Sequence, residues 1–294
     1  MKRKLPIGGV QTFSHLREKY DVYVDKTMFI YEMASRYKAV FLSRPRRFGK
    51  SLLCSTIASL FQGQKDLFEG LAISKTDWEW KEYPVIHIDL SSGNFTESNG
   101  LSILREKLNF MLKHCAQNHG LNIDFGEHPF LNFTKLITEL SGTIDKAVII
   151  IDEYDNPLLN TIDKPEINKD IREELKGFFS VIKQYDAHIQ FAFVTGITKF
   201  AQVSVFSGFN QPKDISMAAD YCDICGITQE ELEKNFAPEI DMYASKYGGR
   251  ENYLNKLWEY YNGYFFTEDK KSVYNTYGIL NHFDSDAKFV KDVS

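Results

Sequence analysis

The sequence predicts an α/β fold, a parallel sheet with crossover helices, followed by a small C-terminal helical subdomain. Three observations support this prediction. Short β-rich runs alternate with stretches of helical period, a Gly-Lys-Ser tripeptide follows the first run, and beyond about residue 218 the sequence pattern is mainly that of helices. Parallel strands need a long crossover connection, so this alternation is typical of a parallel sheet.

Each β-rich run is apolar and short enough to be one buried strand. The expected strands span residues 39–42, 85–90, 147–151 and 189–194, and the helical stretches span residues 50–61, 101–115 and 171–185. In the second helical stretch, Leu101, Leu104, Leu108 and Leu112 recur at spacings of three and four, so that face is predicted to be core.

The C-terminal segment is predicted to contain helices at residues 228–247 and 251–261. Thr228 and Glu231 have the spacing of a capping box, which makes Thr228 a helix start. We therefore divide the chain into a core, residues 1–218, and a helical lid, residues 219–294.

Composition narrows the class of protein. The chain has 294 residues, 43% hydrophobic and 26% charged, with a formal net charge of -5. This balance is ordinary for a globular protein and argues against a wholesale nucleic-acid coat. The apolar run at residues 147–151 is far shorter than the roughly 18 residues of a membrane span. Pro6 and Gly8 interrupt the N-terminal segment where a signal peptide would be apolar, so we expect a cytoplasmic protein without membrane contact.

Four cysteines are too few for a disulfide scaffold, and reduced thiols are expected. Cys222 and Cys225 have ligand spacing for half of a zinc site, with His114, Cys115 or His119 as further ligands. The favoured interpretation is that these cysteines are small apolar fillers, because structural zinc needs four ligands.

The sharpest local feature is Phe41-Leu-Ser-Arg-Pro-Arg-Arg-Phe-Gly-Lys-Ser51, between a predicted strand and a predicted helix. It ends like a phosphate-binding loop. Gly49 lets the backbone amides turn toward a phosphate, Lys50 reaches the β- and γ-phosphates, and Ser51 can hold Mg²⁺. The strict pattern has glycine at position 44, where this chain has Arg44.

Two further strands end in groups suited to the same ligand. The strand at residues 147–151 is followed by Asp152 and Glu153, one carboxylate for Mg²⁺ and one to orient an attacking water. The strand at residues 189–194 is followed by Thr195, with Lys199 close behind. Parallel α/β sheets bind ligands at this edge, so the pattern favours binding of ATP with Mg²⁺ as cofactor.

At these residues the chain resembles the bacterial AAA-ATPase-like family, P-loop ATPase domains commonly fused to a C-terminal PD-(D/E)XK nuclease-like domain. The resemblance spans nearly the whole chain. It rests on Leu5-Pro-Ile-Gly, Tyr23-Val-Asp-Lys26, the phosphate-loop string, Ile151-Asp-Glu-Tyr-Asp-Asn-Pro157, Thr195-Gly-Ile-Thr-Lys199, Phe206-Ser-Gly-Phe-Asn210 with Asp214-Ile215, and Tyr261-Asn-Gly-Tyr264 with Val273-Tyr-Asn275.

The resemblance implies a P-loop NTPase fold of the additional-strand catalytic-glutamate type. Lys50 and Ser51 would contact nucleotide and metal, Asp152 would bind Mg²⁺, and Glu153 would be the water-orienting base. It also implies Thr195 as a sensor and a fifth short strand at residues 214–217. The nucleotide contacts we expect from the loop are Arg44, Pro45, Arg46, Arg47, Phe48, Gly49, Lys50, Ser51 and Leu52. No Asp followed by Glu-x-Lys has room for a sheet around it, so no nuclease-like domain is expected within this chain.

Three roles are open for Arg44, Arg46 and Arg47: neutralising phosphate charge, reaching a neighbouring subunit's nucleotide, or pairing with Asp155 and other carboxylates. Arg47 is counted among the candidate catalytic residues. Asp25 is expected to cap a helix, with contact to adenine or ribose as the alternative.

The function this predicts is Mg²⁺-dependent ATP hydrolysis coupled to a conformational change. A second hypothesis is a nucleotide-gated interaction or regulatory module with little hydrolysis, acting on a nuclease-like or nucleic-acid-bound partner. Both a homo-oligomer and a partner protein are left open as partners. A third is nucleic-acid binding through the arginine cluster, which the acidic balance disfavours.

Overall fold

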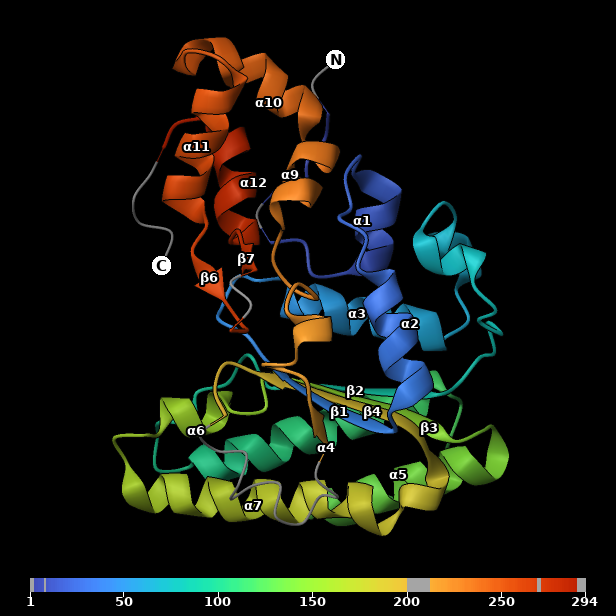
Figure 1. The fold of residues 1–294 in the computed structure, drawn as a ribbon. Coiled ribbons are helices and arrows are strands. Elements are labelled where there is room, and N and C mark those ends of the chain that lie inside the picture. Colours follow the sequence, from blue (N-terminus) through green and yellow to red (C-terminus); the bar gives the residue numbers. More distant parts are fainter. Residues whose placement is uncertain (1–2, 8, 200–211, 269–270, 290–294) are drawn as a thin grey trace.

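A computed structural model describes residues 3–7, 9–199, 212–268 and 271–289 of the chain. It has one central sheet with helices on both faces and a mostly helical unit beyond one of the helical layers (Figure 1). The predicted motif at residues 206–210 lies outside the described residues.

The sheet has five strands in the order β2-β3-β4-β1-β5, and every neighbouring pair is parallel. The strands are β1 (Ala39–Ser43), β2 (Val85–Asp89), β3 (Ala147–Asp152), β4 (Ile189–Gly196) and β5 (Lys213–Asp214). The predicted parallel α/β fold is confirmed, and β4 lies between β1 and β3 as the additional strand. The fifth strand is shorter than the expected 214–217 and begins one residue earlier.

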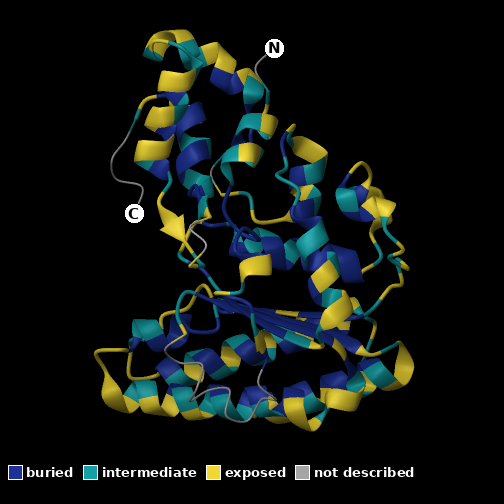
Figure 2. Cartoon of the chain, in the orientation of Figure 1, coloured by how far each residue is buried: buried dark blue, intermediate teal, exposed yellow. Residues whose placement is uncertain are grey.

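Burial on both faces explains why the strands are apolar without alternation. All six residues of β3 are buried, as Figure 2 shows for the sheet as a whole. The buried side chains on the two faces of the sheet form two separate clusters, one containing Ile149, Leu108 and Phe178 and the other Ile150, Ile57 and Phe193. Ile149 and Ile150 point to opposite faces because successive strand residues alternate.

The helices of the core follow these two clusters. One layer holds α4 (Gly100–Asn118), α5 (Pro129–Thr143), α6 (Asn156–Asn160) and α7 (Pro165–Gln184), and the other holds α1 (Phe13–Lys19), α2 (Thr27–Arg36) and α3 (Lys50–Phe61) (Figure 1). Helix α3 begins and ends at the predicted residues, 50 and 61. The helix predicted at 101–115 is α4, which begins one residue earlier. The helix predicted at 171–185 is α7, which begins at Pro165, since proline is tolerated in the first turn of a helix. Helix α5 was not predicted: the β2–β3 crossover contains two helices.

The C-terminal unit is built from α9 (Gln229–Asn235), α10 (Ala237–Ala244), α11 (Arg250–Tyr261), the antiparallel pair β6 (Tyr264–Phe265) and β7 (Ser272–Val273), and α12 (Thr276–Asp284). The predicted capping box is confirmed: Thr228 Oγ1 accepts from Glu231 N at 3.1 Å, and Glu231 Oε2 accepts from Thr228 N at 2.9 Å. The stretch predicted to be helical over 228–247 is divided: α9 ends at Asn235, and α10 begins at Ala237 with Pro238 in its first turn.

Short 3-10 helices complete the described elements. They are η1 (Lys65–Phe68), η2 (Ala72–Lys75), η3 (Asp186–His188), η5 (Ala219–Tyr221) and η6 (Ser245–Tyr247).

The buried cluster of the C-terminal unit is not made by residues 219–294 alone. Leu5 and Val22, from the N-terminal segment, are buried in it beside Tyr253 and Phe283. No described helix combines the length and the apolar character needed to cross a membrane.

Candidate nucleotide site

The loop between β1 and α3 has the backbone shape of an anion cradle. Gly49 precedes the first turn of α3 with φ of 91°, a left-handed conformation that glycine adopts without a steric penalty. Among the described residues no side chain caps α3, and the first amides of a helix have no partner within the helix itself. Lys50 is buried, and its Nζ donates to Pro45 O at 3.1 Å across the loop.

Asp152 ends β3 beside the start of α3. Asp152 as a residue is 3% exposed, and its carboxylate is hydrogen-bonded by Ser51. Burial raises the pKa of Asp152, and the Ser51 hydrogen bond opposes that rise. Its Oδ1 atom has no hydrogen-bond partner among the described residues.

Thr195 lies at the same edge of the sheet. Ile151 of β3 pairs with Val194 of β4, which sets Asp152 beside Thr195, and Tyr154 N donates to Thr195 O at 3.1 Å. Thr195 is fully buried, and its Oγ1 is also without a partner within the described ranges. Two neighbouring strands thus end in unsatisfied buried oxygen atoms, which is uncommon in folded proteins.

Glu153, the residue after Asp152, has a φ of 51°. This left-handed conformation is uncommon for residues other than glycine and is found at functional sites. Burial raises the pKa of the Glu153 carboxyl, and the Lys50 ammonium is the largest opposing influence.

Sequence reasoning missed Asp89. It ends β2 directly opposite Asp152 and contributes to raising the pKa of both Asp152 and Glu153, after burial and the nearer groups. The available signal was the same as for Asp152, a carboxylate at the end of an apolar strand. Asp89 and Glu153 also act on Lys107 of α4. Burial lowers the pKa of the Lys107 ammonium, and the charges of the two carboxylates oppose this shift.

Arg44 does not take the position expected of a nucleotide contact. Its side chain is 1% exposed, donates to the carbonyl oxygens of Ser216 (2.7 Å) and Tyr221 (3.0 Å), and does not line the cavity at the loop. Pro45 does not line that cavity either. Burial lowers the pKa of the Arg44 guanidinium.

The other charged side chains near the loop differ in whether they face the cavity or pair with other residues. Arg46 and Arg47 are exposed and line the cavity, and the Arg47 guanidinium lies 4.6 Å from the centre of the Tyr277 ring. Lys199 forms an ion pair with Asp214 at 2.8 Å. Asp155 is fully buried and accepts hydrogen bonds from Ile197 N and from Thr198 N and Oγ1, so it joins the ends of β3 and β4.

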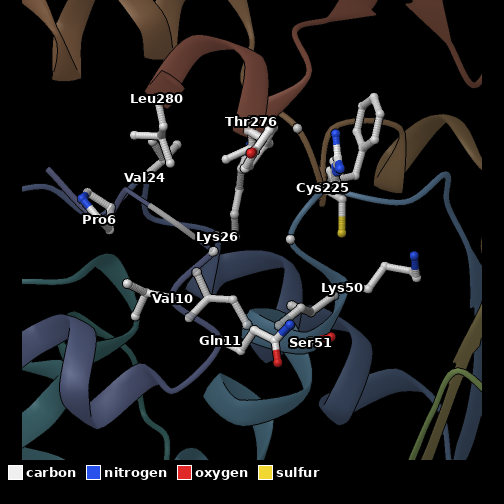
Figure 3. A pocket seen from close by; sticks show the side chains of 18 of the residues that line it. Pro6, Val10, Gln11, Val24, Lys26, Lys50, Ser51, Cys225, Thr276 and Leu280 are labelled. Carbon is white, nitrogen blue, oxygen red and sulfur yellow. The ribbon is translucent and has the colours of Figure 1, made fainter. Parts of the chain in front are cut away.

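A cavity of about 440 Å³ opens beside the loop. Figure 3 shows Lys50 and Ser51 at one part of its wall, with Val10, Gln11 and Val24 from the N-terminal segment and Thr276 and Leu280 from α12 around the rest. Phe48, Gly49, Leu52 and Glu153 of the expected site residues also line it, whereas the buried Asp152 and Thr195 do not. The N-terminal and α12 residues of the wall are far from the loop in sequence. The Tyr23-Val-Asp-Lys26 string of the family resemblance contributes Tyr23, Val24 and Lys26 to the wall, whereas no motif signalled Thr276 or Leu280.

Asp25 does not line this cavity, whereas Tyr23 and Lys26 do. The Asp25 carboxylate accepts from Thr27 N at 2.9 Å and from Ala72 N at 2.7 Å. Helix α2 begins at Thr27 with Lys26 in the capping position, so Asp25 stabilises the first turn from one residue further out than expected.

The cavity suits a nucleoside triphosphate with a hard cation. The start of α3 and Lys50 suit phosphates, and apolar side chains such as Val24 and Leu280 suit a base. Ser51 on the wall and Asp152, which is hydrogen-bonded to it but does not line the cavity, carry oxygen atoms of the kind that Mg²⁺ prefers. The described residues hold no cluster of three or more His, Cys, Asp or Glu that could bind a metal by itself. A magnesium site of this kind needs none, since phosphates and water complete its ligands.

The cysteines are free and buried. Cys115 belongs to the cluster under one face of the sheet and Cys225 to the cluster on the other, so the sheet separates the two groups of proposed zinc ligands.

The strand order, the β1–α3 loop and the acidic end of β3 together define an α/β P-loop NTPase. The chain belongs to the Predicted AAA-ATPase (AAA-ATPase_like) family, whose model matches residues 6–206. A relative from Azotobacter chroococcum mcd 1, described as an uncharacterized protein in the vnfD 5' region, is 38% identical over 282 residues. The match covers 95% of this chain and 51% of the relative, so the chain spans about half the length of that protein.

Among solved structures, the ORC2 protein of Aeropyrum pernix in ADPNP-ADP complexes is similar, with a TM-score of 0.40 and 12% identity. The match covers 97% of this chain and 70% of that chain.

Proposed function

We propose that this chain binds ATP with Mg²⁺ in the cavity beside the phosphate loop and hydrolyses it. Lys50 and the amides at the start of α3 would hold the β- and γ-phosphates, and Ser51 and Asp152 would hold the cation. Glu153 would orient the attacking water, and Thr195 would contact the γ-phosphate or that water. In this proposal residues 1–218 form the ATPase core and residues 219–294 its lid.

The observation that carries the proposal is the pair of unsatisfied oxygens, Asp152 Oδ1 and Thr195 Oγ1, at the ends of neighbouring strands. Leaving a buried polar atom unpaired costs about 1–3 kcal/mol. A bound ligand that satisfies both atoms would recover this cost.

The bound magnesium ion would draw charge from the phosphates during transfer. This chain's own contribution would be positioning. Burial favours the protonated form of Glu153 and the Lys50 ammonium favours its carboxylate, so Lys50 helps to keep Glu153 able to accept a proton from water.

The test compares three variants of the full chain. Glu153→Gln should keep ATP affinity while the rate of phosphate release falls by a factor of about 10² or more. Lys50→Ala should instead lose affinity. Glu166→Gln, an exposed carboxylate in the first turn of α7, is the matched control and should behave as wild type. Undiminished phosphate release by Glu153→Gln would remove Glu153 from the mechanism.

A second candidate is a nucleotide-gated interaction module with slow hydrolysis. It is favoured by the packing of phosphate-loop side chains on the C-terminal unit, such as Arg47 on Tyr277. Steady-state phosphate release at saturating ATP separates the two, because a gated module would bind tightly and release almost none. A role for Arg47 on a neighbouring subunit's nucleotide, and with it a homo-oligomer, is a further part of the proposal.

A further inference from the structure

The phosphate loop has an unusual side-chain anchor at position 44. Arg44 stands where the strict loop pattern has glycine, and it is completely enclosed. Its two terminal nitrogens donate to the carbonyl oxygens of Ser43, Ser216, Tyr221 and Cys222 at 2.7 to 3.4 Å. The guanidinium also lies 3.9 Å from the centre of the Phe266 ring. Phe266 directly follows β6, so this one side chain joins the phosphate loop to the C-terminal unit.

Phe48 makes a second anchor to the same hairpin. Its ring, 1% exposed, meets the rings of Tyr264 and Phe266 edge-on, with centroids 4.7 and 5.8 Å away. Its carbonyl oxygen accepts from Gly226 N at 3.2 Å. Both ends of the segment 44–48 are therefore held by residues that follow position 215 in the sequence.

Arg44 does not line the cavity and Phe48 does, but the hairpin on which both side chains dock lies outside it. None of the described residues of the β6–β7 hairpin, residues 264–268 and 271–273, lines the cavity. A loop that must order itself on binding loses affinity through conformational entropy, whereas a pre-ordered loop avoids that cost.

We infer that Arg44 and Phe48 are positioning residues, which hold the phosphate loop in its ligand-binding shape by docking on Phe266 and the β6–β7 hairpin. Nucleotide affinity then depends on a hairpin that does not touch the nucleotide. Because binding linkage is reciprocal, nucleotide in turn stabilises the docked hairpin. The inference rests on the nucleotide site proposed above.

The test uses neighbouring aromatic residues of the full chain. Phe266→Ala removes the ring shared by Arg44 and Phe48. Phe265→Ala is the matched control, because Phe265 is 50% exposed on the same hairpin. Phe266→Tyr is the rescue variant, since it keeps a ring. The readouts are the Kd for a fluorescent ATP analogue and hydrogen exchange of the backbone amides of residues 46–51 without nucleotide.

Phe266→Ala should raise the Kd about tenfold, in line with the strength of a cation–π and an aromatic contact together. It should also accelerate exchange at residues 46–51. Phe266→Tyr and Phe265→Ala should stay within about twofold of wild type in Kd. In the wild type, nucleotide should slow exchange at residues 264–266. Wild-type Kd and exchange in Phe266→Ala would overturn the inference.

The outcomes separate this inference from the proposed function. If the wild type binds no nucleotide, the proposed function fails, and unchanged exchange at residues 46–51 in Phe266→Ala would still refute the positioning role. If Phe266→Ala does not fold, Phe266→Leu keeps apolar volume while removing the ring, and the same exchange comparison decides.

Discussion

The stability of the C-terminal unit should depend on pH through His282. This side chain is 1% exposed in the core of the unit. Its Nε2 lies 2.7 Å from Tyr253 Oη, and its Nδ1 lies 3.1 Å from Lys288 O and 3.3 Å from Tyr261 Oη. The neutral ring with its proton on Nδ1 satisfies these partners, donating to Lys288 O and accepting from Tyr253. Protonating Nε2 would replace that acceptor with a second donor.

The pKa of His282 falls from its ordinary value of 6.5 to about 4, mainly because of burial; the hydrogen bond with the Lys288 carbonyl opposes this shift, and the charge of Lys246 adds to it. The unfolded chain therefore binds more protons than the folded chain between these two values. Stability must rise with pH across that window and fall as the pH drops through it. From pH 7 to pH 5, the linkage costs about 2 kcal/mol of the free energy of unfolding.

The assay is urea unfolding at pH 7, 6 and 5, followed by tyrosine fluorescence and by circular dichroism. Carboxylates elsewhere also respond to pH, so the measured quantity is the difference between wild type and His282→Gln, which cannot titrate. The variant should be less stable at pH 7 but should lose about 2 kcal/mol less than wild type on going to pH 5. His114→Gln, at an exposed position, is the control and should follow wild type. Parallel pH profiles for wild type and His282→Gln would refute the reasoning.

Substitutions at three other positions test helix capping, packing and backbone conformation through the midpoint and slope of urea unfolding. Thr228→Ala should cost about 1 kcal/mol by removing the helix cap, while Thr228→Ser keeps it; equal losses would argue against the cap. Gly177→Ala, in the interior of α7 with open space around the added methyl, should stabilise the protein by about 0.5–1 kcal/mol, and destabilisation would contradict the open site. Gly196→Ala should destabilise by about 1–3 kcal/mol or more, because the new Cβ would lie 2.6 Å from Asp155 Oδ1 and Tyr154 Cδ1; a neutral effect would be inconsistent with that close approach.

Local patterns were sufficient wherever the relevant contacts lie near in sequence. Helix α3 has its expected bounds because Gly49 precedes an apolar helical stretch, and the Thr228–Glu231 cap depends on residues three apart. The second helix of the β2–β3 crossover and helix α12 were missed, because their existence depends on packing against distant strands and helices.

The site divides in the same way. Gly49, Lys50, Ser51, Asp152 and Glu153 can be found from sequence, since each follows a strand whose apolar run ends visibly. Asp89 also lies at the end of an apolar run, but it belongs to no recognised motif. The cavity wall could not be assembled from sequence, because the Tyr23–Lys26 motif and residues such as Cys225 and Leu280 come together only when the N-terminal segment and the C-terminal unit meet at the loop.

Arg44 shows the limit most clearly. Sequence placed it in the phosphate loop and left three roles open for its charge. Only the folded chain decided that its guanidinium meets the carbonyls of Ser216 and Tyr221 and the face of Phe266. The sequence by itself determined a parallel α/β sheet with a phosphate loop and an acidic strand end, because hydrophobic period and loop chemistry are local. The tertiary structure decided what each polar group faces, because a buried charge takes its partners from whichever distant segment packs against it.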